Sequence, residues 1–109
     1  MENFNFLKSG WDFENIISRG RQAINKLFII YCLPNGNKGI RVGICVGKSL
    51  GKAVRRNRIK RQIREIVKMY NFERENKDFV IIARKKILNS EFQEISELLG
   101  RLISNIQCR

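Results

Sequence analysis

A helical spacing of hydrophobic residues near the N-terminus predicts a short helix. Phe13, Ile16 and Ile17 recur at i, i+3 and i+4, which places them on one face. The segment before them has the spacing of a capping box, and Gly20 follows where a helix can end. We therefore expect an amphipathic helix over residues 9–19.

Two hydrophobic runs after this helix predict β-strands. Residues 27–33 form an uninterrupted run rich in β-branched and aromatic side chains. In residues 40–46 the branched residues recur at every second position, so one face is buried and Arg41 points the other way. The segment 34–39 between them is dense in turn residues, which predicts a hairpin.

The second half of the chain predicts a helix, a strand and a last helix. Isoleucine and valine at helical spacing indicate an amphipathic helix over 51–70, and a continuous apolar run indicates a strand over 78–84. Because a helix joins strand 40–46 to strand 78–84, the two strands should be parallel, with both faces covered. A capping sequence at Ser90 opens the last helix, whose expected core-facing residues are Phe92, Ile95, Leu98, Leu99, Leu102, Ile103 and Ile106.

This order of elements predicts one α/β (α+β) domain over residues 1–109. Three helices would pack on a mixed sheet as a two-layer sandwich. With 43% hydrophobic residues the chain can form a single modest core. No apolar run is long enough to span a bilayer, and the N-terminus lacks the features of a signal peptide, so we expect a cytoplasmic protein.

Positive charge is concentrated in one short window. Residues 48–64 contain eight Lys or Arg and no Asp or Glu, which is +8 of the net charge of +12. On the predicted helix, Asn57, Arg61, Arg64 and Lys68 lie opposite the isoleucine stripe, with Arg58 and Lys60 on the flanks. A solvated helix face usually mixes both signs, because like charges at i, i+4 cost a few tenths of a kcal/mol per pair. The window therefore indicates a polyanionic partner.

The start of this helix strengthens that interpretation. Arg55 and Arg56 lie near the predicted helix N-terminus, where backbone N–H groups and the helix dipole favour anions. Gly47 and Gly51 would let the backbone approach a phosphate closely. The preference for Arg over Lys favours bidentate phosphate contacts and stacking on bases.

Other residue types argue against chemistry in this chain. Histidine is absent, which removes the commonest general base and metal ligand. Cys32, Cys45 and Cys108 include no CxxC pair, and the first two are expected to be buried reduced thiols within strands. The acids are scattered, and we interpret the cluster of Glu73, Glu75 and Asp78 as solvated loop charges rather than a metal site. We expect no catalytic residue and no metal ligand.

The basic window and several flanking segments together resemble the protein subunit of bacterial ribonuclease P. The matching features are Arg56-Asn57-Arg58 followed by Ile59-Lys60-Arg61 and Arg64, together with Arg41-Val42-Gly43, Ile81-Ile82-Ala83-Arg84, Leu7-Lys8 and Asp12-Phe13. They occur in the family's order and cover most of the chain. The resemblance implies a sheet of about four strands with a left-handed βαβ crossover that contains the basic helix. The general rule would have predicted a right-handed crossover.

The resemblance also implies a function. It indicates the protein subunit of a ribonucleoprotein endoribonuclease, a hydrolase that removes the 5′ leader of precursor tRNA. The chemistry would lie in a catalytic RNA and its bound Mg²⁺, with no cofactor intrinsic to the protein. The expected partners are that RNA and precursor tRNA, and the protein without RNA is expected to be a monomer.

Carried over position by position, the resemblance assigns two sets of site residues. The first set would contact RNA through the basic helix and its approach, and consists of Lys48, Lys52, Arg55, Arg56, Asn57, Arg58, Lys60, Arg61, Arg64 and Lys68. The second would form a cleft for the single-stranded leader, and consists of Phe13, Ile17, Tyr31 and Arg41. Aromatic faces and a cationic groove suit single-stranded RNA.

Several alternatives stay open from the sequence. Phe13 and Tyr31 also fit core packing, and Ile17 stands where the family often has a second aromatic residue. Trp11 could be the stacking residue instead of Phe13, and Phe4 and Phe6 could cover either the cleft or the core. Two other functions share some of these features: a structural RNA-binding protein, such as a ribosomal one, and a protein-only nuclease, which would need clustered carboxylates.

Overall fold

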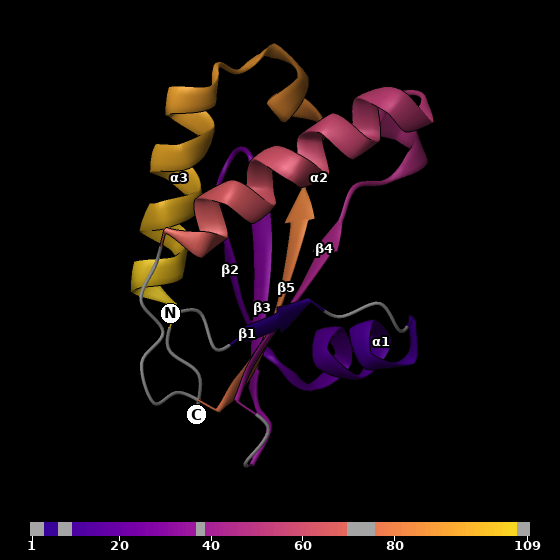
Figure 1. The fold of residues 1–109 in the computed structure, drawn as a ribbon. Helices are drawn as coiled ribbons and strands as arrows, with labels where there is room; N and C mark the ends of the chain where they lie inside the picture. Colours follow the sequence, from indigo (N-terminus) through magenta and orange to yellow (C-terminus); the bar gives the residue numbers. More distant parts are fainter. Residues whose placement is uncertain (1–3, 7–9, 37–38, 70–75, 107–109) are drawn as a thin grey trace.

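The fold is an open sheet with helices packed on it (Figure 1). The computed structural model describes residues 4–6, 10–36, 39–69 and 76–106, with side chains from Phe13 onward within these ranges. The described elements are β1 (Phe4–Phe6), α1 (Gly10–Arg19), β2 (Arg21–Ile24), β3 (Phe28–Pro34), β4 (Ile40–Cys45), the 3₁₀ turn η1 (Lys48–Leu50), α2 (Ala53–Lys68), β5 (Lys77–Ala83), the 3₁₀ turn η2 (Lys85–Asn89) and α3 (Phe92–Asn105).

The sheet is mixed and has the strand order β1-β4-β5-β3-β2 among the described residues. β4 is parallel to both β1 and β5, whereas β3 is antiparallel to β5 and to β2. The predicted fold class and the parallel β4–β5 pair are confirmed. The predicted hairpin between residues 27–33 and 40–46 is wrong, because β5 lies between β3 and β4 and pairs with both. The short edge strands β1 and β2 were not predicted, so the sheet has one strand more than the expected four.

The crossover from β4 through α2 to β5 is left-handed, as the family resemblance implied. In Figure 1, α2 lies in front of the sheet, β4 and β5 both run upward, and the chain passes from β4 on the right to β5 on its left. This hand is rare for parallel strands. In the same view α2 extends across the sheet, and the side of this helix that faces away from the sheet is exposed within the described part of the chain.

The main core lies between one face of the sheet and the helices α2 and α3. Side chains on this face are fully or nearly fully buried on each of the three central strands, for example Ile30, Val42 and Ile81. They pack against the apolar stripes of α2 and α3. Of the stripe predicted for α3, Ile95, Leu99 and Leu102 are buried, whereas Leu98, Ile103 and Ile106 are partly buried and pack against the core.

The opposite face of the sheet is covered only in part, by α1. We call it the α1 face. Ile16 of α1 and Val80 of β5 are fully buried but lie outside the main core cluster. Gly20 ends α1, with its N–H donating to the Ile16 carbonyl over 2.7 Å, and a Cβ there would lie 2.6 Å from that oxygen. The expectation that both faces would be covered is therefore confirmed only in part, because a single ten-residue helix covers part of this side of the five-stranded sheet.

Three local expectations need correction. Phe92 is 46% exposed rather than part of the core, because it is the first residue of α3 and comes before the residues of this helix that pack on the core. Ser90 does not cap α3, since Glu91 is the N-cap residue and the Ser90 hydroxyl donates to the carbonyl of Lys86. Cys45 is only half-buried, unlike Cys32, because it points to the α1 face beyond the reach of α1; Cys108 lies outside the described residues.

A buried ion pair joins β4 to β5 on the α1 face. The Arg41 guanidinium donates from Nε and Nη2 to the two carboxylate oxygens of Asp78, each over 2.7 Å. Asn35 donates to the same carboxylate over 2.8 Å. Since the Asp78 side chain is only 5% exposed, its negative charge depends on these donors. Asp78 is therefore a structural residue of β5, and its interpretation as a solvated loop charge is wrong.

We expect Asp78→Ala to lower the free energy of unfolding by about 3 kcal/mol, because it leaves the half-buried guanidinium of Arg41 without its carboxylate. Urea denaturation measures this. Glu97→Ala is the matched control, since Glu97 pairs with Arg101 on the exposed side of α3 and should change the stability by at most about 0.5 kcal/mol. Equal effects of the two substitutions would show that the Asp78 pair is no more important than a surface pair.

Candidate nucleic-acid interface

The basic window forms an exposed cationic surface on α2 and the loop before it. Ile59, Ile63, Ile66 and Val67 are buried against the core, so the rest of the helix surface points away from it. The predicted RNA-contacting residues that are exposed are Lys48, Lys52, Arg55, Asn57, Arg58, Arg61, Arg64 and Lys68. Arg56 and Lys60 are half-buried. The structure thus brings all ten predicted residues together on one helix and its approach.

Two side-chain interactions show how far this surface extends around α2. On one flank, Arg55 donates to the carbonyl of Leu88 in η2 over 3.4 Å. On the other flank, Lys60 lies close enough to Cys45 of β4 to influence its thiol. Burial raises the pKa of Cys45, and the positive charge of Lys60 partly opposes that rise. Arg55 therefore contacts η2, and the positive charge of Lys60 acts as far as Cys45 on β4.

The loop before α2 is held by the helix itself. Leu50 is buried, and Arg56 donates from Nε to the carbonyl of Gly51 over 3.0 Å. Gly51 has φ +126°, a conformation that other residues rarely adopt, whereas Gly47 has an ordinary φ of −70°. Only the glycine at 51 is thus required by the backbone. It lets the chain turn from η1 into α2 with Lys48 and Lys52 on either side.

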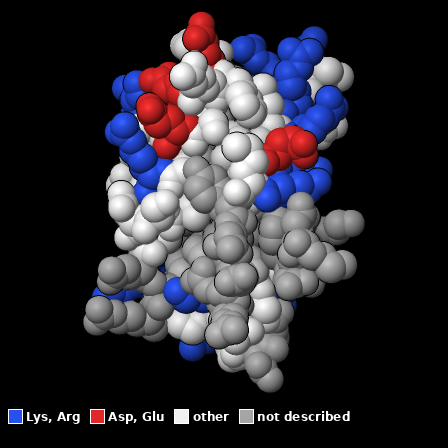
Figure 2. Space-filling view, turned by 60° about the vertical axis from the view of Figure 1, so that its left-hand side comes forward, with Lys and Arg blue, Asp and Glu red and all other residues white. Residues whose placement is uncertain are grey.

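Positive charge is concentrated on α2, whereas acidic residues on α3 pair with basic ones. In Figure 2, Lys and Arg gather along one upper side of the molecule, while the acidic residues of the visible face group mainly on the other side, next to further basic ones. On α2, Lys68 pairs with Glu65 over 3.6 Å. On the other side, Glu94 of α3 accepts from Lys26, and this hydrogen bond with the Lys26 ammonium is the main reason that the pKa of its carboxyl is lowered. The cationic surface of α2 is the part suited to a polyanion.

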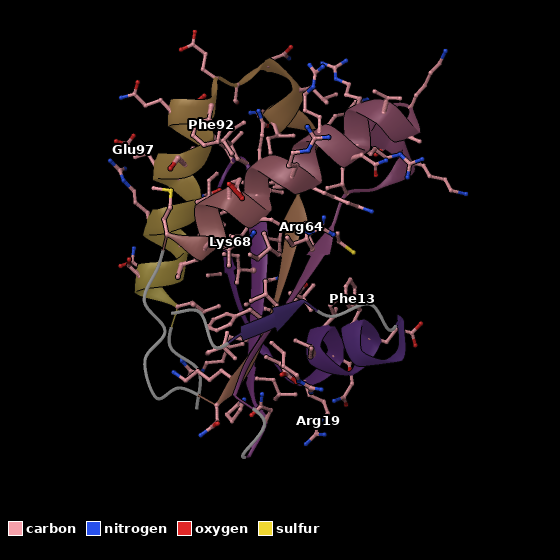
Figure 3. All side chains as sticks on the ribbon, viewed as in Figure 1. Phe13, Arg19, Arg64, Lys68, Phe92 and Glu97 are labelled. Atoms are coloured by element: carbon pink, nitrogen blue, oxygen red, sulfur yellow. The ribbon has the colours of Figure 1, made fainter. Side chains whose placement is uncertain are left out.

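The predicted cleft residues all lie on the α1 face or on α1 itself. The ring of Phe13 packs directly on Gly43 of β4, and a Cβ at Gly43 would lie 2.4 Å from Phe13 Cε1. Figure 3 shows Phe13 rising from α1 toward β4. Tyr31 of β3 and Ile17 of α1 are half-buried. Both aromatic rings are therefore partly packed and partly accessible.

Arg41 lies on the same face, but its guanidinium forms the buried ion pair with Asp78. It holds the carboxylate of Asp78 with two hydrogen bonds, and its side chain is only 22% exposed. The side chains of Trp11, Phe4 and Phe6 lie outside the described residues, so the choice between Trp11 and Phe13 stays open. The backbone of residues 4–6 forms β1 at the edge beside β4.

Strand register orders the α1 face into rows that cross the sheet, and two of these rows lie beyond the row of the Arg41–Asp78 pair. One row runs from Gln22 of β2 through Tyr31 and Val80 to Gly43, beneath Phe13. The next row is apolar and runs through Ile24, Ile29, Ile82 and Cys45. Ile24 is 53% exposed, and the other three are half-buried. The face therefore offers an accessible surface of aromatic and aliphatic groups that ends at Cys45 of β4.

Sequence reasoning missed two residues of this face. Gly43 supports the Phe13 ring, and an isolated glycine within a strand is a signal of such a close approach. Gln22 hydrogen-bonds Tyr31, and nothing in the sequence indicated it because β2 was not predicted. Within the described residues no group of three or more His, Cys, Asp or Glu could hold a metal ion; Glu73 and Glu75 lie outside them.

Comparison with known proteins identifies the family of this chain. The family model for ribonuclease P matches residues 1–107. The chain belongs to the ribonuclease P protein family. A ribonuclease P protein component from Streptococcus pyogenes serotype M12 is 40% identical over 96 residues, which cover 88% of this chain and 81% of the relative.

Solved structures of ribonuclease P proteins share the fold. The Staphylococcus aureus protein superposes with a TM-score of 0.84 at 34% identity, covering 91% of this chain and 92% of the other. The Thermotoga maritima protein gives a TM-score of 0.84 at 33% identity, covering 93% and 96%. Membership as a protein component implies an RNA subunit as partner and a role in tRNA processing. Among the described helices of this family member, none is long and apolar enough to cross a membrane.

We expect Gly43→Ala to lower the free energy of unfolding by about 1–3 kcal/mol, because the new methyl group overlaps the Phe13 ring. In a Phe13→Ala background the ring is absent, so most of this cost should disappear. Urea denaturation of the two single variants and the double variant measures the coupling. Additive losses would mean that another contact, not Phe13, requires a glycine at position 43.

Proposed function

We propose that this chain binds the catalytic RNA of ribonuclease P through the cationic surface of α2 and the 5′ leader of precursor tRNA across the α1 face. In doing so it assists the hydrolytic removal of the leader that gives the mature tRNA 5′ end. The observation that carries this proposal is the exposed cationic surface of α2, presented on the fold of the ribonuclease P protein family.

The two surfaces suit two different RNA structures. α2 presents arginines along a rigid helix, which suits the phosphates of a folded RNA, since guanidinium groups bind phosphate oxygens in a bidentate manner. The α1 face presents Phe13, Tyr31 and an apolar row, which suits the unstacked bases of a single strand. Lys60 of α2 lowers the pKa of Cys45 on the α1 face by its positive charge, so its field reaches the proposed leader surface as well.

We infer that the Mg²⁺ needed for the reaction is held mainly by the RNA subunit. The most buried carboxylate of the described residues, Asp78, is saturated by Arg41 and Asn35 and does not fit a metal site. The ion would supply charge stabilisation and an activated water at the cleaved phosphate. The residues of this chain would instead position the two RNAs.

We also infer a monomeric protein before RNA binding and a cytoplasmic location, where precursor tRNA is made in bacteria. A structural RNA-binding protein remains the main alternative function. It would share the cationic helix but would not change the cleavage of precursor tRNA.

The deciding experiment is cleavage of 5′-labelled precursor tRNA at low Mg²⁺ by the protein alone, a bacterial ribonuclease P RNA alone, and both together. Efficient cleavage at the mature 5′ end only by the combination supports the proposal. Cleavage by the protein alone would place the chemistry in this chain. No stimulation of a competent RNA would favour the structural RNA-binding role.

We expect Arg58→Ala or Arg61→Ala to weaken binding to the catalytic RNA and to reduce the slope of log affinity against log salt by about 1 per lost phosphate contact. The reason is that fewer counterions are released. Filter binding over a series of salt concentrations measures the slope. Arg101→Ala, an exposed arginine on α3, is the matched control and should leave the slope unchanged. A slope that is unchanged in the α2 variants would reassign those residues to packing.

We expect Phe13→Ala to weaken binding of precursor tRNA with a long leader by about tenfold, as for the loss of one stacked base. Binding of mature tRNA by the same reconstituted particle should stay unchanged, because it has no leader. Fluorescence titration of both substrates gives the ratio. An equal loss for both substrates would indicate a damaged fold instead of a lost leader contact.

A further inference from the structure

Tyr31 has a polar neighbour that the proposed function does not use. Gln22 of β2 donates from Nε2 to the hydroxyl oxygen of Tyr31 over 2.7 Å. The two residues are direct cross-strand partners, so both side chains lie on the α1 face. Gln22 is exposed and Tyr31 is half-buried, so the pair is accessible at the edge of the sheet.

This hydrogen bond fixes the polarity of the Tyr31 hydroxyl. A phenolic hydroxyl has one proton to donate and can also accept. Because Gln22 donates to the oxygen, the hydroxyl proton must point elsewhere. It is then available to an acceptor that lies over the α1 face.

The position of the pair matches the path of a strand that crosses the sheet. Tyr31 is separated from Gly43, and hence from the Phe13 ring, by Val80 of β5 alone. On the other side it borders β2, whose Ile24 is 53% exposed. A single-stranded RNA stacked on Phe13 and continuing toward β2 would pass directly over the Tyr31 hydroxyl.

We propose that Gln22 is a positioning residue that turns the Tyr31 hydroxyl into a hydrogen-bond donor to an acceptor atom of the 5′ leader. This inference rests on the proposed binding of the leader to the α1 face. It adds β2 to that surface and assigns a specific chemistry to Tyr31: donation of a hydrogen bond, in addition to the contact made by its ring.

The test measures the affinity of the reconstituted protein–RNA particle for precursor tRNA and for mature tRNA, and takes their ratio as the leader contribution. We expect Tyr31→Phe to reduce this contribution by about three- to tenfold and Gln22→Met by about two- to fivefold, as for the loss of one hydrogen bond. Gln22→Met should have no further effect in a Tyr31→Phe background, because the hydroxyl that it orients is gone. Gln93→Met on the exposed surface of α3 is the matched control.

Gln22→Glu tests the polarity directly. A carboxylate can only accept, so it would draw the tyrosine proton toward itself and away from the leader. We expect a larger loss for Glu than for Met, and most of the difference should be absent with Phe at position 31. A Gln22→Glu protein that binds the leader as the wild type does would overturn the proposed polarity.

Three other results would overturn the inference. Equal losses from Gln22→Met with Tyr and with Phe at position 31 would show that Gln22 does not act through the hydroxyl. Equal losses for precursor and mature tRNA would show a change in the fold. If the wild-type particle itself binds both substrates equally, leader binding by the α1 face fails, and the role of Gln22 fails with it.

Discussion

The burial of one stripe of α2 against the sheet is the interaction on which the rest of the structure depends. Ile59, Ile63 and Ile66 are almost completely removed from solvent. Each such side chain contributes about 1.5–3 kcal/mol on burial, whereas like-charge pairs on a helix surface cost about 0.2–0.5 kcal/mol each. Core packing therefore outweighs the repulsion among the neighbouring cations and fixes which side of the helix carries them. The protein can keep a surface of one sign facing solvent because the opposite side of the same helix holds the fold.

The crossover connection from β4 to β5 determines which face of the sheet α2 covers. β5 is parallel to its neighbour β4, so the chain must return to the other end of the sheet between them, and α2 makes that return on the side that also holds α3. Both larger helices thus cover one face, and only α1 remains for the other. The partly uncovered α1 face is a consequence of this distribution. It separates the apolar and aromatic surface from the cationic one, although the charge of Lys60 on α2 still acts on Cys45 of the α1 face.

The polar interactions of the α1 face serve stability and recognition in different places. Near the start of β5, Arg41 and Asp78 form a closed ion pair that satisfies a buried charge. Farther along the same face, Tyr31 and Gln22 form an accessible pair with hydrogen-bonding capacity to spare. Arg41 was assigned to the leader surface by family resemblance, and in the structure its guanidinium forms the ion pair with Asp78. Its effect on RNA binding would be exerted largely through the position of β4 against β5.

The sequence by itself determined the local elements and the charged helix. The period of the isoleucines fixed both the existence of α2 and the direction of its cations, because helical geometry relates the two without reference to the remainder of the chain. Arg41 was correctly placed opposite the buried residues of its strand for the same reason. Only the tertiary structure decided which strands are neighbours. The turn-rich segment 34–39 predicted a hairpin, but β3 and β4 each pair with β5, whose residues come more than 30 positions later in the chain. The short strand β2, the contact of Phe13 with Gly43 and the Gln22–Tyr31 pair likewise depend on residues far apart in the chain that the sheet brings together, and no local pattern encodes such distances.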